Sequence, residues 1–123
     1  MAAIRRWLWE LRRAGRIVCI PEVADYEVRR QLRLLGSDAG IENLDELGRR
    51  FRYLRVTSAI WRRAADLWAH ARRQGSPTAE DAALDADVIL AALAEREGGI
   101  VATENIRHLE LFVPAKRWRD IGP

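Results

Sequence analysis

Apolar residues recur at helical spacing in some segments of this chain and run continuously in others, and the two kinds of segment alternate. The first stripe marks one face of a helix predicted over about residues 2–14: Ile4, Trp7, Leu8 and Leu11. Gly15 supplies a stop for that helix. The run at 17–20 is continuous and apolar, as is typical of a buried parallel strand. Pro21 then opens a second predicted helix, which ends near Gly36.

The same alternation continues toward the C-terminus. We expect a third helix at about 41–51, a strand at 53–57 and a fourth helix with Ser58 as its N-cap. Core positions of the second and fourth helices keep helical spacing: Ala24, Val28, Leu32 and Leu35 in the second, and Ile60, Ala64, Leu67 and Ala71 in the fourth. A loop at 74–81 leads into an apolar helix, a strand at 100–103 and a short final strand.

Strands that alternate with helices predict a parallel sheet covered by helices on both faces. The expected fold is therefore α/β, a three-layer α/β/α sandwich with a short parallel sheet. The length of 123 residues suits one domain with a real core, so residues 1–123 are expected to form a single domain.

The charge and cysteine content narrow the function only slightly. The formal net charge is +3, and the basic residues are almost all arginines, with Lys116 the only lysine. Such a charge supports a polyanionic partner only if it is clustered on one face. The single cysteine, Cys19, allows no intramolecular disulfide, and no apolar stretch approaches membrane-spanning length. The arginine-rich start does not resemble a signal peptide, so a cytoplasmic location is expected.

Acidic and amide side chains gather where predicted strands end. Three segments supply them: Glu22, Asp25 and Glu27 after the first strand, Asp85 and Asp87 at the start of a helix that continues to Arg96, and Glu104 and Asn105 after the strand at 100–103. Ligands of a parallel sheet bind beyond the carboxyl ends of its strands. We therefore expect these groups to lie at one end of the sheet.

Capping offers a simpler explanation for some of these acids. An aspartate at a helix start is favoured by the orphan N–H groups and by the helix dipole, with no function needed, and Asp85 fits this explanation better than a catalytic role. Asp87 is different, because Val88 and the residues after it surround it with apolar surface. A carboxylate there needs a partner, and hard oxygen ligands suit Mg²⁺ or Mn²⁺.

Other chemistries find less support in the sequence. His70 and His108 are far apart, and a zinc site needs more histidines or cysteines than the chain offers. No phosphate-binding glycine motif or nucleophilic serine motif is present. The five tryptophans, Trp7 and Trp61 among them, are expected to serve as core or interface residues rather than as base-stacking platforms.

These segments resemble the PIN-domain family, and within it the VapC-type toxins, which are metal-dependent endoribonucleases. IPEVADYEVRRQL resembles the helix that carries the family's acid after its second strand, which falls on Glu27. DADVILAALA resembles its D-x-x-I-A-A helix start, which falls on Asp87. VATENIRHLELF resembles its T-x-N/D turn, which falls on Thr103 and Asn105, with His108 standing where an H-F or D-F pair is common.

The resemblance implies an enzyme that hydrolyses RNA with Mg²⁺ or Mn²⁺ and is neutralised by a small antitoxin protein. The implied catalytic residues are Glu27, Asp87 and Asn105, with Glu27 and Asp87 as metal ligands. Asp85, two residues before Asp87, is kept beside them as a further catalytic candidate. The family begins with a short strand ending in an aspartate that binds metal, whereas this sequence passes from Met1 directly into its first predicted helix. We expect that the first strand is absent from this chain, that activity is impaired without it, and that the native protein is longer.

Two other functions remain open. One is a catalytically inactive PIN-like module that binds RNA or a protein partner through the same surface. The other is a dimerising scaffold, suggested by the apolar and tryptophan-rich first helix. A scaffold of this kind is compatible both with the enzyme and with the inactive module. A homodimer is expected on this ground.

Overall fold

The computed structural model describes residues 2–75 and 81–123. The chain divides into two compact units, which we call unit 1 (Met1–Arg55 with Gly122–Pro123) and unit 2 (Val56–Ile121). Most of the loop predicted at 74–81 lies outside the described residues. Within the described ranges, no helix combines the length and the apolarity that a bilayer crossing requires.

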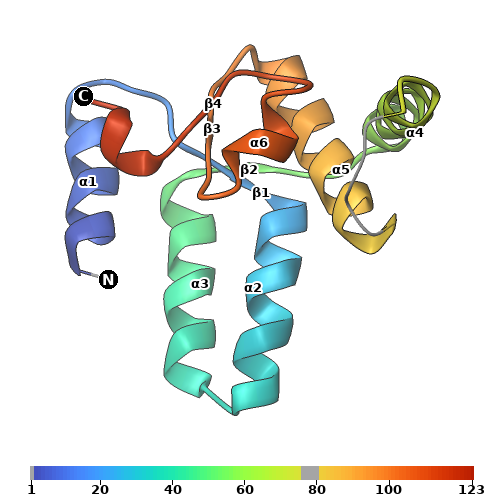
Figure 1. The fold of residues 1–123 in the computed structure, drawn as a ribbon. Coiled ribbons are helices and arrows are strands. Elements are labelled where there is room, and N and C mark those ends of the chain that lie inside the picture. Colours follow the sequence, from blue (N-terminus) through green and yellow to red (C-terminus); the bar gives the residue numbers. More distant parts are fainter. Residues whose placement is uncertain (1, 76–80) are drawn as a thin grey trace. The chain divides into compact units, whose positions relative to one another are not determined.

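Unit 1 contains a helical hairpin beside a pair of short parallel strands (Figure 1). Its elements in chain order are α1 (Ala2–Arg13), β1 (Cys19–Pro21), α2 (Glu22–Leu35), α3 (Asp38–Arg50) and β2 (Arg52–Leu54). β1 pairs with β2 in parallel, from Cys19 opposite Arg52 to Pro21 opposite Leu54. The antiparallel helices α2 and α3 form the crossover that parallel pairing requires.

The turn between α2 and α3 is set by two glycines and a serine. Gly36 adopts the left-handed conformation with φ 68° and ends α2, as the sequence predicted. Ser37 caps α3, because its Oγ accepts a hydrogen bond of 3.1 Å from the Gly40 N–H. A Cβ on Gly40 would lie 2.6 Å from Cδ2 of Leu32, so the glycine lets the start of α3 approach α2 closely.

The buried side chains of unit 1 come from α1, α3 and the residue after α3: Leu11, Ile41 and Phe51. The ring of Phe51 lies 5.3 Å from that of Trp9, and the Arg12 guanidinium covers both rings. The apolar stripe predicted for α2 was wrong in part, because Val28 and Leu35 are 48% and 77% exposed. The helix instead turns polar side chains toward α3, as described below.

Unit 2 is built on two packed helices, α4 (Ser58–Arg73) and α5 (Asp81–Glu97) (Figure 1). They are followed by β3 (Val101–Ala102), α6 (Ile106–Leu109), β4 (Ala115–Lys116) and the 3-10 helix η1 (Trp118–Asp120). β3 and β4 pair in parallel. The stripe predicted for α4 is confirmed, since Ile60, Ala64, Leu67 and Ala71 are all buried. On α5, Ala91 and Ala92 are 0% and 1% exposed, and such small side chains allow close helix packing.

Three details of unit 2 correct the expectations from sequence. The N-cap of α4 is Thr57 rather than Ser58, because the Thr57 Oγ1 accepts the Ile60 N–H at 3.3 Å. The helix α5 includes Asp81, so neither Asp85 nor Asp87 stands in its first turn. Trp61 is 55% exposed and is therefore not a core residue of this unit.

The α/β class with parallel strands is confirmed, although the strands are shorter than predicted. In the described residues they form two pairs, β1 with β2 and β3 with β4.

Candidate functional site

Asp87 lies in the second turn of α5, against the apolar side of that helix. Its side chain is 14% exposed, and the adjacent Val88 and the residue one turn later, Ala91, are buried. Asp85 is exposed, and two residues correspond to about 200° of rotation around a helix. The two aspartates therefore point to different sides of α5, and unit 2 does not bring them together.

The segment after β3 supplies the neighbours of Asp87. Thr103 Oγ1 accepts a hydrogen bond of 2.9 Å from the Asn105 N–H, which shapes the turn into α6. One turn later, His108 Nδ1 lies 3.0 Å from Asn105 Nδ2 and 3.4 Å from Asp87 Oδ2. The structure thus gathers a carboxylate, a carboxamide and an imidazole next to the carboxyl end of β3.

The two contacts of His108 place opposite demands on Nδ1. The Asn105 amide N–H donates only to a bare Nδ1, whereas the Asp87 carboxylate accepts only from a protonated Nδ1. A rotation of the Asn105 amide by half a turn would place its oxygen toward Nδ1, and an Nδ1–H would then face two oxygen acceptors. The imidazole therefore links the orientation of Asn105 to that of Asp87.

The sequence did not identify His108 as a neighbour of Asp87. Asp87 and His108 lie on different elements and are far apart in the chain, so no spacing pattern relates them. The available signal was local, since Asn105 and His108 are three residues apart and share a face once α6 forms.

Glu27 belongs to unit 1, on α2, and its side chain is half-buried. It follows Asp25 by two residues and so points to a different side of the helix. Asp25 is 12% exposed and is engaged by two side chains: its Oδ1 accepts 2.9 Å from Arg29 Nε, and its Oδ2 accepts 2.8 Å from Tyr53. Of these two acids, Asp25 has a structural role and Glu27 remains the ligand candidate.

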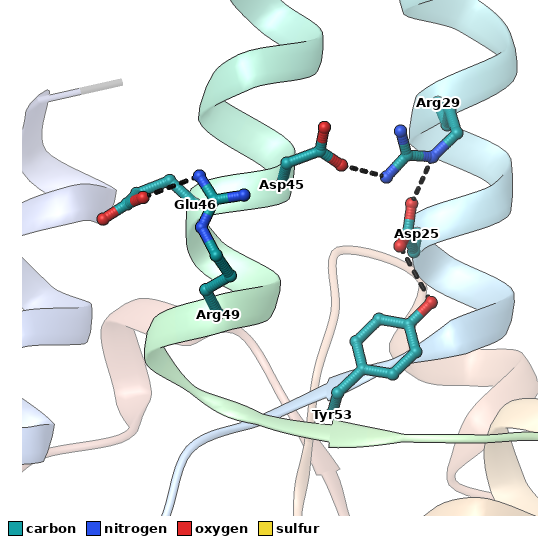
Figure 2. Close-up of polar contacts among 6 residues, drawn as sticks. All are labelled: Asp25, Arg29, Asp45, Glu46, Arg49 and Tyr53. Atoms are coloured by element: carbon teal, nitrogen blue, oxygen red, sulfur yellow. Dashed lines mark hydrogen bonds and ion pairs between the residues drawn. The ribbon is translucent and has the colours of Figure 1, made fainter.

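The partners of Asp25 belong to a polar network that joins α2, α3 and β2 (Figure 2). Arg29 bridges the helices, because its second nitrogen lies 2.7 Å from Asp45 Oδ1 on α3. The hydrogen bond from Arg29 holds the pKa of Asp45 below its ordinary value. Burial, followed by the hydrogen bond to Asp25, raises the pKa of Tyr53 to about 12. The same two carboxylates raise the pKa of Arg29, so the guanidinium stays charged.

The side chains gathered around Asp87 in unit 2 suit Mg²⁺ or Mn²⁺ better than zinc. Across residues 2–75 and 81–123, no three His, Cys, Asp or Glu side chains form a metal-binding group. A structural zinc site would need such a group. Mg²⁺ is commonly held by one or two carboxylates together with waters and substrate phosphates. Asp87 and the Asn105 amide oxygen are hard oxygen donors, so they fit Mg²⁺ or Mn²⁺.

The fold and these side chains define a small α/β protein in which a carboxylate, a carboxamide and an imidazole lie near the carboxyl end of a parallel strand. The family model of the PIN domain matches residues 2–111, nearly the whole chain. The chain therefore belongs to the PIN domain family. This finding confirms the family resemblance that the three sequence segments indicated.

Two solved structures share the fold. VapBC from Salmonella typhimurium, in its DNA-bound crystal structure, superimposes with a TM-score of 0.70 at 18% identity, covering 94% of this chain and 83% of that one. VapBC-1 from nontypeable Haemophilus influenzae gives a TM-score of 0.66 at 15% identity, covering 85% of this chain and 77% of that one. At these identities the likeness establishes the PIN-like fold. No curated protein matched this chain significantly.

Proposed function

We propose that this protein is a metal-dependent endoribonuclease of the toxin–antitoxin type, which hydrolyses phosphodiester bonds in RNA. Membership of the PIN domain family and the likeness of its fold to two VapBC structures support the proposal. One observation of the structure carries it furthest. Asp87 is largely buried two turns into α5, where capping gives it no role, and it lies beside His108 from the segment that follows β3.

In this proposal Asp87 is a ligand of Mg²⁺ or Mn²⁺, and the Asn105 amide oxygen adds a neutral donor. Glu27 of unit 1 is proposed as a metal ligand as well, because the family's acid falls on it. When bound, such an ion would neutralise charge at the scissile phosphate and would make water a better nucleophile. His108 positions Asp87 and Asn105 through the contacts of its Nδ1. Asp85 is exposed and points to a different side of α5 from Asp87, so in this proposal it binds no metal ion.

The partners follow from the same family. A small antitoxin protein neutralises the enzyme, as the VapBC complexes suggest by analogy. A homodimer and a cytoplasmic location complete the proposal, and the described residues contain no membrane-spanning helix.

The proposal is tested by RNA cleavage with the protein as its own gene encodes it. We expect cleavage of a fluorescent RNA with Mg²⁺ or Mn²⁺, and none in excess chelator. Asp87→Asn keeps the size of the side chain and removes the charge, so it should lower the rate by at least about 100-fold, as expected for a metal ligand that acts directly in catalysis. Asp85→Asn should have a smaller effect.

Asp120→Asn is the matched control, because Asp120 is an exposed aspartate of the same unit, in η1. A rate that Asp87→Asn and Asp120→Asn leave equally unchanged would contradict the proposed site. RNA binding without any metal-dependent cleavage would favour the inactive binding module instead.

A further inference from the structure

The solvent-facing side of α4 carries tryptophan and arginine at helical spacing. The buried stripe of this helix, which includes Ile60 and Ala64, borders this side rather than lying opposite to it. We define the α4 face as Trp61, Ala65, Trp68 and Arg72, whose positions at i, i+4, i+7 and i+11 form one stripe. Trp61 is 55% exposed, Ala65 and Arg72 are exposed, and Trp68 is half-buried.

An arginine already stacks on one of these rings. The Arg72 guanidinium lies over Trp68, 5.2 Å from the ring centroid. This contact keeps the indole and the positive charge together on one surface. Trp61 lies two turns away, about 10 Å along the helix axis. Ala65 separates the two indoles and adds only a methyl group between them.

The helix α4 carries a net positive charge. α4 contains Arg62, Arg63, Arg72 and Arg73 against Asp66, a formal charge of +3. Arg63 is held by Glu95 of α5, with its Nε 2.7 Å from Oε2. Arg62 and Arg73 are exposed, and by helical geometry they flank the α4 face on the same side.

We infer that the α4 face binds a single-stranded nucleic acid, with bases stacked on Trp61 and Trp68 and with phosphates placed near Arg62, Arg72 and Arg73. Aromatic side chains that take bases, set among arginines that follow the backbone, are the common means of holding single strands. The presence of both groups on one exposed stripe supports a polyanion with unpaired bases. In the proposed ribonuclease, RNA would be this ligand.

The same charges argue against a second copy of this chain as the occupant. A two-fold symmetric dimer places each surface patch against itself. Arg72 of one α4 face, together with the flanking Arg62 and Arg73, would then lie near the same residues of the other copy, and like charges brought together in an interface oppose association. A nucleic acid strand supplies the opposite charge along the whole face.

The inference does not depend on cleavage or on metal, so it is tested in the presence of excess chelator. The probe is a short fluorescein-labelled oligo(dT), and its matched control is an abasic oligonucleotide of equal length, which keeps the phosphates and lacks the bases. Binding is followed by fluorescence anisotropy between about 50 and 200 mM salt, because affinity that depends on phosphate contacts falls steeply over this range.

Trp61→Ala should weaken binding of oligo(dT) by about fivefold or more, the low end of what one stacked base contributes, and should leave binding of the abasic strand unchanged. Arg72→Gln should weaken binding of both strands and reduce the salt slope by about 0.7. Arg119→Gln is the control, because Arg119 covers Trp118 at 5.1 Å from the ring centroid in the same manner, on η1. It should leave binding of both strands as in the parent protein.

Circular dichroism of each variant shows whether the fold is kept, and both substituted positions are exposed. Equal binding of oligo(dT) by the parent protein and by Trp61→Ala and Arg72→Gln would overturn the inference. It would also be overturned if Trp61→Ala dissociated a dimer, as measured by sedimentation, without changing oligonucleotide binding. Tight binding of poly-glutamate that Trp61→Ala weakens equally would assign the face to an acidic protein instead.

Discussion

Tyr53 donates a hydrogen bond of 2.8 Å to Oδ2 of Asp25, although the two residues are 28 positions apart in the chain. The bond connects β2 to the first turn of α2, while the other oxygen of Asp25 accepts from Arg29 (Figure 2). Both carboxylate oxygens of Asp25 are therefore used by protein donors. This is the physical reason why Asp25 is a structural residue of unit 1, whereas Glu27 stays the ligand candidate of α2.

Tyr53→Phe removes this bond and leaves Asp25 with one partner fewer. We expect a loss of about 1–2 kcal/mol in the free energy of unfolding near neutral pH, measured by urea denaturation. The pKa of Tyr53 is raised to about 12 in the folded protein from an ordinary value of 10. The stabilisation is therefore fully present below pH 10 and is lost as the pH rises from 10 toward 12. In Tyr53→Phe that decline should disappear, and an unchanged decline would contradict the assignment.

Arg29→Gln tests the bridge between α2 and α3 at low pH. The pKa of Asp45 is lowered from 3.8 by its hydrogen bond to Arg29, so this contribution to stability is present above pH 3.8 and is lost as the pH falls below it. The parent protein should lose stability on acidification more steeply than Arg29→Gln, measured by urea denaturation along a pH series. Arg30→Gln is the control, because Arg30 is exposed and covers Tyr26 instead. Equal slopes for all three proteins would count against the bridge.

Ala91→Leu tests how closely α4 and α5 pack. Ala91 is 0% exposed, so the added carbon atoms must displace packed neighbours, and we expect destabilisation by about 1–3 kcal/mol. Ala65→Leu adds the same atoms to an exposed position of α4 and should change stability by less than about 0.5 kcal/mol. Thermal or urea unfolding compares the two variants. Similar effects at both positions would mean that Ala91 has room around it.

Arg63→Lys tests the paired hydrogen bonds between Arg63 of α4 and Glu95 of α5. Arg63 places Nε 2.7 Å and its terminal nitrogen 2.8 Å from the two oxygens of Glu95, a geometry that lysine cannot reproduce. Because both side chains are more than 40% exposed, we expect a loss below about 1 kcal/mol that shrinks at high salt. Arg62→Lys is the matched control on the neighbouring position. A loss that does not depend on salt would point to packing rather than to charge.

Mn²⁺ should stabilise the parent protein against thermal unfolding, because an ion that binds only the folded state raises its stability by about 2.7 kcal/mol at 100 times the dissociation constant. Asp87→Asn should abolish most of this stabilisation, and Asp120→Asn should keep it. The measurement does not require RNA, so it separates failure of metal binding from failure of cleavage. Equal Mn²⁺ stabilisation of the parent and Asp87→Asn would remove Asp87 from the proposed ligands.

The stripe of α4 shows what can be predicted well from sequence. Ile60, Ala64, Leu67 and Ala71 are the apolar residues at helical spacing, and all four are buried. The α2 stripe shows the opposite case, because apolar residues occur around much of that helix and Val28 and Leu35 are exposed. Spacing alone did not indicate that a salt bridge would turn Arg29, rather than Val28, toward α3.

The sequence pattern predicts the start of α5 too late in the chain, and the reason is local. Capping preference predicts Asp85 and Asp87 at the helix start, yet the alanines before them are strong helix formers, and the helix includes Asp81. This correction changes the interpretation of Asp87, since an acid in the second turn has no orphan N–H groups to cap. The prediction of one domain over residues 1–123 stays a prediction.

The sequence by itself determined the α/β class, the parallel strands, the family and the identity of the candidate acids, because these depend on the spacing of side chains along the chain. Only the tertiary structure decided which acids have protein partners: Asp25 is engaged by Tyr53 and Arg29, and Asp87 lies beside His108. It also decided that Trp61 faces solvent. Such contacts join residues that are distant in sequence, and they are set by the packing of whole helices, which no local pattern encodes.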